Sequence, residues 1–463
     1  MTALPSKKLF GTDGVRGVAG ELLTAELALA LGRAGTEGSA AARPQVLIVR
    51  DTRESGPMLA AALAAGVAAA GGDALDARVL PTPAASVLVR RLGLDLAAVI
   101  SASHNPWHDN GIKFFGPDGR KLDDRADAGI EARVAELLAG GGPRRVALDM
   151  REKPVEPGRS VRGLGRVRAL EGALDDYLRE LAAAFRIDLS GVRVALDCAN
   201  GSTYRAAPAI FERLGAEVDA IAIEPDGRNI NDGCGSTDPA SLAERVRSSG
   251  AALGFAFDGD GDRVVAVDST GAVRDGDELI ALVATHLGVA GRLDGGVAVT
   301  VMSNYGFHRA MADAGIEVAT TPVGDRSVSA ELERREWTLG GEQSGHLIWT
   351  GFAPTGDGIA AALLALQALA GADLAATRPI ERLPQVLTNV TVAERDAVDG
   401  AGAVWDAVER EAAALEGRGR VLVRASGTEP LVRVMVEAPS ATEAEEACGR
   451  LVEIVRAELG HAG

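Results

Sequence analysis

Residues 45–81 read Q-V-L-I-V-R-D-T-R-E-S-G-P-M-L-A-A-A-L-A-A-G-V-A-A-A-G-G-D-A-L-D-A-R-V-L-P, and their pattern indicates the fold class of the chain. An apolar strand pattern leads into a polar loop, an alanine-rich helix from Met58 to Ala70, two glycines, and a second strand from Ala74 to Leu80. Strand, helix, glycine and strand predict a βαβ unit, whose strands pair in parallel through a right-handed crossover.

The same order of elements recurs at residues 192–225 and again at residues 297–322. In each copy a polar loop follows the first strand, at residues 198–203 and 303–306. The repeats predict three related α/β domains with mixed, mainly parallel sheets. Ligands of such sheets bind beyond the carboxyl ends of the strands, where these polar loops lie.

The last part of the chain follows a different order. Ser440 and Glu443 form a capping box at the start of a final helix that runs through Leu459. The order predicts a separate α+β domain (β-α-β-β-α), with a strand at 386–392, a helix at 401–415, strands at 420–425 and 431–437, and the final helix.

Composition limits the class of protein. The chain has 463 residues, 47% hydrophobic and 24% charged, as in ordinary soluble globular proteins, and we expect neither a membrane span nor a signal peptide. Its net charge of −17 argues against nucleic acid or an anionic membrane as the main partner. Cys198, Cys234 and Cys448 are far apart, which predicts reduced thiols in a cytoplasmic protein. The sequence leaves open whether the chain forms a homodimer.

The segment from Ile100 to Lys113 reads I-S-A-S-H-N-P-W-H-D-N-G-I-K. An apolar strand that ends in this way exposes a serine hydroxyl on a turn, where it can be reached and modified. Ser101 and Ser103 are equally eligible as the nucleophile on this ground.

Asp258, Asp260 and Asp262 alternate with glycines between two apolar strands, and Arg263 follows them. Three carboxylates spaced in this way can surround one hard cation. A hairpin turn is the simpler interpretation, but a turn needs only one Asp-Gly pair. The positions of Arg263 and Ser269 exclude an EF-hand. The pattern favours one divalent cation, Mg²⁺, per chain.

Two further loops carry polar groups. In G-G-E-Q-S-G-H (340–346), Glu342 and Ser344 can bind sugar hydroxyls, although the segment could be a plain polar loop, and His346 is as easily a buried structural residue as a catalytic one. This segment is not an esterase elbow. In R-A-S-G-T-E-P (424–430), two hydroxyls and a glycine, with arginines at 424 and 433, predict a phosphate cradle.

A serine, a cation site, a sugar loop and a phosphate cradle are the parts needed for phosphoryl transfer through a phosphoserine. Lys113, Arg16 or His346 would move the proton of the sugar hydroxyl. Arg16 lies in the glycine-rich segment 10–17, which alone indicates only a turn. The chain has neither an NTP phosphate loop nor a dinucleotide-binding fingerprint, so the motifs do not support a kinase or a dehydrogenase.

With these motifs in the same order along nearly its whole length, the chain resembles the α-D-phosphohexomutases. Within that family it is most similar to the bacterial phosphoglucosamine mutase branch, through residues 10–17, 229–237 and 321–326. Ser327 departs from the pattern, because an aromatic residue is expected there. The resemblance selects Ser103, over Ser101, as the phosphoserine.

The resemblance also implies roles for the remaining residues. Ser103 and the three aspartates would hold Mg²⁺, and Arg16, Lys113 and His346 would be catalytic. The expected substrate-binding residues are Arg263, Gly324, Asp325, Glu342 and Ser344, and the expected phosphate-binding residues are Arg424, Ser426, Gly427, Thr428 and Arg433.

We therefore expect four domains around a central cleft: residues 1–150 with the phosphoserine loop, 165–254 ending at the metal loop, 255–370 with the sugar loop, and 375–463 with the phosphate loop. Residues 140–168, rich in Arg, Pro and Gly, are expected to form a linker and an irregular edge.

The implied reaction converts glucosamine 6-phosphate to glucosamine 1-phosphate, with glucosamine 1,6-bisphosphate as intermediate and activator. It would supply amino-sugar nucleotides and cell-wall precursors. Three alternatives remain: a phosphoglucomutase/phosphomannomutase acting on glucose or mannose phosphates, a sugar-phosphate binding protein without turnover, and a metal-dependent phosphatase.

Overall fold

The computed structural model describes residues 9–11, 13–139, 163–426 and 429–460. The chain forms two compact units, one from residues 1–301 and 319–377 and the other from residues 302–318 and 378–463. Most of the expected linker lies outside the described residues. None of the described helices is long and apolar enough to cross a membrane.

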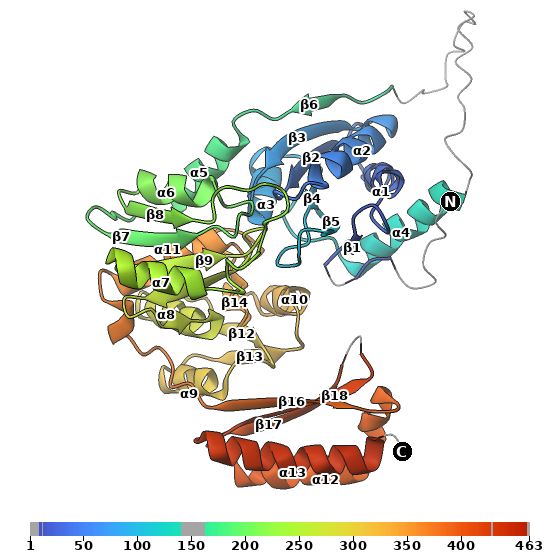
Figure 1. Cartoon of the computed structure of the whole chain (residues 1–463). Helices are drawn as coiled ribbons and strands as arrows, with labels where there is room; N and C mark the ends of the chain where they lie inside the picture. The colour runs from blue at the N-terminus through green and yellow to red at the C-terminus, as the bar shows by residue number, and fades with distance from the viewer. Residues whose placement is uncertain (1–8, 12, 140–162, 427–428, 461–463) are drawn as a thin grey trace, which may run out of the picture. The chain divides into compact units, whose positions relative to one another are not determined.

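The first sheet of the larger unit and its helices comprise, in chain order, β1 (Val15–Val18), α1 (Ala25–Glu37), β2 (Gln45–Arg50), α2 (Gly56–Ala69), β3 (Asp73–Val79), α3 (Thr82–Arg91), β4 (Leu96–Ile100), β5 (Asp109–Phe115), α4 (Asp124–Ala139) and β6 (Val167–Ala169) (Figure 1). The strand order is β1-β5-β4-β2-β3-β6. β2 pairs in parallel with β3 and β4, which confirms the predicted βαβ unit. β5 pairs antiparallel with β4 and β1.

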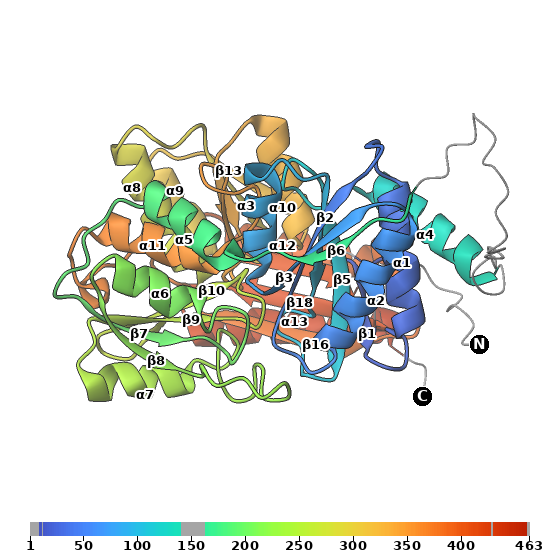
Figure 2. The same ribbon diagram turned by 90° about the horizontal axis from the view of Figure 1, so that it is seen from above.

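Alternation along β2 places Val46 and Ile48 in one core with α1 and α2. α3 contacts the same strand from the other face (Figure 2). α1 and α2 pack closely because each helix has a glycine against the other's backbone: a Cβ on Gly32 would lie 2.3 Å from the Leu63 carbonyl oxygen, and a Cβ on Gly66 would lie 2.1 Å from the Leu29 carbonyl oxygen. This packing buries the face of the sheet opposite α3.

The second sheet and its helices comprise, in chain order, α5 (Ala173–Ala184), β7 (Arg193–Asp197), α6 (Ala206–Arg213), β8 (Glu217–Ile221), α7 (Ala240–Ser249), β9 (Leu253–Phe257), β10 (Val264–Asp268) and β11 (Val273–Arg274). Its strand order is β11-β10-β9-β7-β8, with β7 parallel to β8 and β9. α6 and α7 lie on opposite faces of the sheet (Figure 2).

The structure moves two expected domain boundaries. The boundary at residue 254 falls inside β9, which pairs antiparallel with β10, so the aspartate-rich segment is the turn of a hairpin within one sheet. The second sheet therefore extends to β11. The expected start of the second domain at residue 165 precedes β6, which pairs with β3 of the first sheet.

The third sheet has the strand order β13-β12-β14-β15. β12 and β14 are parallel, whereas β14 and β15 are antiparallel. α8 and α11 pack against each other, and α10 contacts β12 and β14. The elements are α8 (Gly276–Val289), β12 (Val297–Thr300), β13 (Val318–Thr321), α10 (Asp325–Arg335), β14 (Leu339–Gly341), β15 (Leu347–Trp349), α11 (Gly358–Leu369) and the 3-10 helix η1 (Leu374–Ala376).

The smaller unit contains α9 (Tyr305–Asp313), β16 (Gln385–Thr391), the 3-10 helix η2 (Arg395–Gly400), α12 (Gly402–Ala414), β17 (Arg420–Ala425), β18 (Leu431–Glu437) and α13 (Ala441–Leu459). The strands form an antiparallel sheet in the order β16-β18-β17, and α12 and α13 cover one of its faces (Figure 1). The Ser440 side chain accepts the Glu443 N–H at the start of α13, as predicted. The β-α-β-β-α order is confirmed.

Candidate active site

Ser103 lies three residues beyond β4, in a left-handed backbone conformation with φ of 54°. Its Oγ donates to Asp258 Oδ2 at 2.5 Å. Ser101 points elsewhere, because its Oγ donates to Asp51 Oδ2 at 2.6 Å. The structure therefore separates the two serines that the residue pattern left equal, and it places Ser103 at the aspartate cluster.

The expectation of an exposed hydroxyl is wrong in this conformation, since Ser103 is only 2% exposed. The reason is the hairpin turn that packs on it. A Cβ at Gly259 would lie 2.6 Å from the Ser103 carbonyl oxygen, so glycine permits this approach. The serine loop and the aspartate loop are in direct contact.

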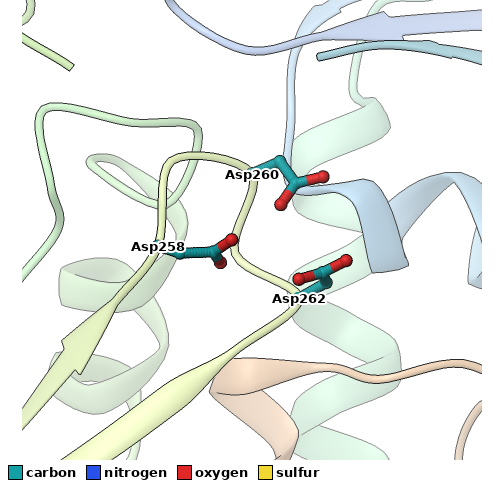
Figure 3. Close-up of side chains that lie close together, drawn as sticks. All are labelled: Asp258, Asp260 and Asp262. Atoms are coloured by element: carbon teal, nitrogen blue, oxygen red, sulfur yellow. The ribbon is translucent and has the colours of Figure 1, made fainter. Parts of the chain in front are cut away.

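Asp258, Asp260 and Asp262 are all buried on the turn between β9 and β10 (Figure 3). Each offers a carboxylate oxygen within 4.8 Å of those of the other two. Burial and the neighbouring Asp262 and Asp260 charges raise the pKa of Asp258 well above its ordinary value. Asp260 Oδ1 and Asp262 Oδ1 are buried, and no residue in the described part of the chain forms a hydrogen bond with either oxygen. Orphaned carboxylate oxygens in a crowded cluster fit a hard divalent cation.

Lys113, on β5, is buried beside this cluster. Its Nζ lies 2.8 Å from Asp260 Oδ2, 3.7 Å from Asp262 Oδ2 and 3.8 Å from Asp13 Oδ2. Burial lowers the pKa of Lys113, but the three carboxylates outweigh it and raise the pKa above its ordinary value. Lys113 is therefore a cation in this arrangement.

Asp13 and Lys121 were not predicted, yet they connect several candidate residues. Asp13 pairs with Arg16 of β1 and with Lys121. Lys121 also pairs with Asp325, the first residue of α10. Burial raises the pKa of Asp13, but the surrounding Lys and Arg cations hold it well below its ordinary value. The available signals were the place of Asp13 in the glycine-rich segment 10–17 and, for Lys121, the small number of lysines in the chain, which is five.

The loop between β14 and β15 carries Glu342, Ser344 and His346. Glu342 Oε1 accepts the Gly324 N–H at 3.1 Å, while Ser344 is exposed. The His346 ring is buried, with Nδ1 3.6 Å from Asp262 Oδ1.

The second ring nitrogen of His346, Nε2, accepts the Gly356 N–H at 3.2 Å, which places the proton of the neutral ring on Nδ1. Burial lowers the pKa of His346, but Asp262 and Asp325 raise it overall. Both interpretations of His346, structural and catalytic, are compatible with these contacts.

Arg263 also lies at the aspartate cluster. The Arg263 N–H donates to Asp258 Oδ1 at 3.1 Å, and its Nε lies 3.9 Å from Asp262 Oδ1. Ser327, the departure from the family pattern, lines a cavity of about 390 Å³ together with Lys121 and Asp325. Contacts within the larger unit thus link Ser103, the three aspartates, Arg16, Lys113, Arg263, His346 and Asp325, and they join Glu342 to Gly324, whereas Ser344 is exposed.

The predicted phosphate loop belongs to the smaller unit. Arg424 on β17 is the register partner of Arg433 on β18. Burial and the adjacent Arg433 charge lower the pKa of Arg424. The Ser426 N–H donates to the Leu431 carbonyl oxygen at 2.9 Å. The predicted residues Gly427 and Thr428 lie outside the described residues.

Comparison with known families matches four domain models of the phosphoglucomutases and phosphomannomutases. They are alpha/beta/alpha domain I at residues 7–139, domain II at 175–271, domain III at 275–387, and the C-terminal domain at 387–454. Together with the three α/β sheets and the C-terminal α+β unit, these matches define the class as a four-domain phosphohexomutase.

Similar proteins of known name agree with this class. Phosphoglucosamine mutase of Pelotomaculum thermopropionicum is 48% identical over 97% of this chain and 99% of the relative, and that of Desulforudis audaxviator is 49% identical over 96% and 97%. The chain therefore belongs to the phosphoglucomutase/phosphomannomutase family, in its phosphoglucosamine mutase branch.

Solved structures share the fold at lower identity. A phosphoglucomutase/phosphomannomutase family protein from Burkholderia thailandensis aligns with a TM-score of 0.78, 24% identity and 98% coverage of both chains. N-acetylphosphoglucosamine mutase from Aspergillus fumigatus, in complex with GlcNAc-6P and magnesium, aligns with a TM-score of 0.65, 20% identity and coverage of 97% and 96%.

Proposed function

We propose that the chain interconverts glucosamine 6-phosphate and glucosamine 1-phosphate through a phosphoserine at Ser103, with glucosamine 1,6-bisphosphate as intermediate. The observation that carries the proposal is the hydrogen bond of Ser103 Oγ to Asp258, within a buried triad of carboxylates. The names of the relatives at 48–49% identity support the glucosamine substrate.

Asp258, Asp260 and Asp262, together with the phosphorylated Ser103, would hold one Mg²⁺. When bound, the ion would neutralise phosphoryl oxygens and polarise the serine ester bond. Lys113 contributes a fixed positive charge beside the same carboxylates. Its buried position keeps that charge poorly screened and therefore effective on a phosphoryl group.

Sugar binding and proton transfer would use side chains that neighbour the aspartate triad. Glu342 and Ser344, with Arg263, Gly324 and Asp325, would bind the sugar phosphate. Proton transfer at the sugar hydroxyls falls to one of the three basic groups at the site, which are Arg16, Lys113 and His346.

The second phosphate of the sugar would be held by the smaller unit, through Arg424, Ser426, Gly427, Thr428 and Arg433. Paired arginines beside a serine hydroxyl suit a phosphate that must be held and released twice in one reaction cycle.

Turnover measured with the purified chain tests the proposal. Glucosamine 6-phosphate with a trace of the 1,6-bisphosphate and Mg²⁺ should give glucosamine 1-phosphate, and Ser103→Ala should abolish the reaction. Clear preference for glucose 1-phosphate would favour the phosphoglucomutase alternative. Release of inorganic phosphate without isomerisation would favour a phosphatase, and no turnover at all would favour a binding protein.

A further inference from the structure

Arg53 is a fully buried arginine that no part of the proposed reaction uses. It follows β2 in the first polar loop of the chain and contacts the loop that bears Ser103. Nη2 donates to the Ser103 and Asn105 carbonyl oxygens, both at 2.9 Å. Nη1 donates to the carbonyl oxygens of Pro106 and, at 3.0 Å, Asp109. One guanidinium therefore gathers four carbonyl groups of a single loop.

Asp51 completes this arrangement on the other side. Its Oδ2 accepts from Arg53 Nε at 2.8 Å and from Ser101 Oγ at 2.6 Å. Ser101 Oγ in turn accepts the Ser103 N–H at 2.9 Å. The N–H and the carbonyl group of Ser103 are thus both tied to the buried Asp51–Arg53 pair.

Asn231, which lies between β8 and α7, contacts the same loop. Its Nδ2 donates to the Ser103 carbonyl oxygen at 3.0 Å and to that of Asn105 at 3.2 Å. It lies in the segment 229–237, one of those that carried the family resemblance, and its φ is 59°. The Ser103 carbonyl oxygen therefore receives donors from two different parts of the chain.

These contacts matter because the conformation of Ser103 is an unfavourable one. A non-glycine residue with φ of 54° is strained unless its surroundings fix it. Turning the Ser103 carbonyl group out of this conformation would break bonds to both Arg53 and Asn231. It would also move Oγ away from Asp258, to which it is now hydrogen-bonded at 2.5 Å.

We propose that Arg53 and Asn231 are positioning residues, which hold the Ser103 backbone in its left-handed conformation and so keep Oγ at the aspartate triad for phosphoryl transfer. The inference rests on the proposed function, because it assigns a role in the phosphorylation of Ser103. Neither residue touches the sugar in this account. Their loss should therefore slow the transfer step and leave substrate affinity nearly unchanged.

Glycine substitutions at two asparagines provide a matched pair for the test. Asn231→Gly removes the amide donor without charge or strain, since glycine accepts a positive φ. Asn200→Gly is the control, because Asn200 also has a positive φ (47°) and its side chain bonds to Glu224 and Asn229. Arg53→Lys, which keeps a charge but cannot span four carbonyl groups, is compared with Arg274→Lys, whose arginine pairs with Asp268.

The measurements are kcat and KM with glucosamine 6-phosphate, the rate at which dephosphorylated protein takes phosphate from glucosamine 1,6-bisphosphate, and the thermal midpoint. We expect Asn231→Gly to lower kcat and the transfer rate by about tenfold or more, with KM within about twofold. Its thermal midpoint should match that of Asn200→Gly, and Asn200→Gly should retain wild-type kcat. Arg53→Lys should behave like Asn231→Gly, and Arg274→Lys like the wild type.

If the wild type is active and Asn231→Gly has the same kcat, the positioning role is wrong, while the proposed function stands. Equal losses in Asn231→Gly and Asn200→Gly would overturn it as well, because they would show a general loss of structure. If Arg53→Lys does not fold, the asparagine pair decides. A wild type that never phosphorylates Ser103 would overturn the proposed function, and this inference with it.

Discussion

Thr82→Val removes one hydroxyl that orients a candidate metal ligand. Thr82 is buried at the start of α3, and its Oγ1 donates to Asp260 Oδ2 at 2.6 Å. The same oxygen accepts from Lys113 Nζ at 2.8 Å. Asp260 Oδ1 has no hydrogen-bond partner among the described residues, so these two donors on Oδ2 leave Oδ1 available to the proposed cation. Valine has nearly the same shape and cannot donate.

Loss of an outer hydrogen bond to a metal ligand typically weakens metal binding by about 10–100-fold. That corresponds to about 1.4–2.7 kcal/mol of binding free energy. Calorimetric titration of Mg²⁺ into the purified wild type and Thr82→Val measures the change directly. Thr36→Val is the control, because the buried Thr36 hydroxyl donates only within α1, to the Gly32 carbonyl oxygen at 2.7 Å. A Kd for Thr82→Val within twofold of the wild type, or an equal change in Thr36→Val, would show that the Thr82 hydroxyl does not orient Asp260 for metal binding.

Three further predictions follow from buried charges. Burial raises the pKa of Asp357 from 3.8 to about 6, so the stability that its protonated form contributes is present below about pH 4 and is lost as pH rises through about 6. Thermal unfolding across this pH range should show the free energy of unfolding of the wild type falling by about 3 kcal/mol relative to that of Asp357→Asn, and parallel pH profiles would contradict this. Chelation by EDTA should lower the thermal midpoint of the wild type more than that of Asp260→Asn, because the buried triad loses its cation, and equal shifts would count against a metal at the triad. Arg420→Met should destabilise the smaller unit by about 3–5 kcal/mol, since fully buried Glu437 loses its ion pair; limited proteolysis of the full chain measures this, and wild-type resistance would show that the pair is dispensable.

The repeated βαβ units could be predicted because local signals agreed with the final structure. Apolar strands, alanine-rich helices and closing glycines recur in residues 45–81 and in the second repeat, where β7 and β8 are indeed parallel. β6 gave no such signal, because its three residues are exposed and lack an apolar pattern. The boundary at residue 254 was misplaced because the charged turn after β9 resembled a junction between domains, while it joins two strands of one sheet.

Part of the candidate site could likewise be predicted from the sequence, and part of it could not. The aspartate triad could be predicted because all three ligands lie within one turn. Lys121 could not, because it meets Asp13 and Asp325 across 108 and 204 positions of the chain. The burial of Ser103 also depends on a distant contact, with the turn that begins at Asp258. Such contacts arise from packing between elements, which no local pattern specifies.

The central claim is that Ser103 carries a phosphoryl group during the reaction. Intact-mass measurement of the purified protein, after incubation with glucosamine 1,6-bisphosphate and Mg²⁺, tests it most directly. We expect a gain of about 80 Da in the wild type and none in Ser103→Ala. An unmodified wild type, or the same gain in Ser103→Ala, would contradict it.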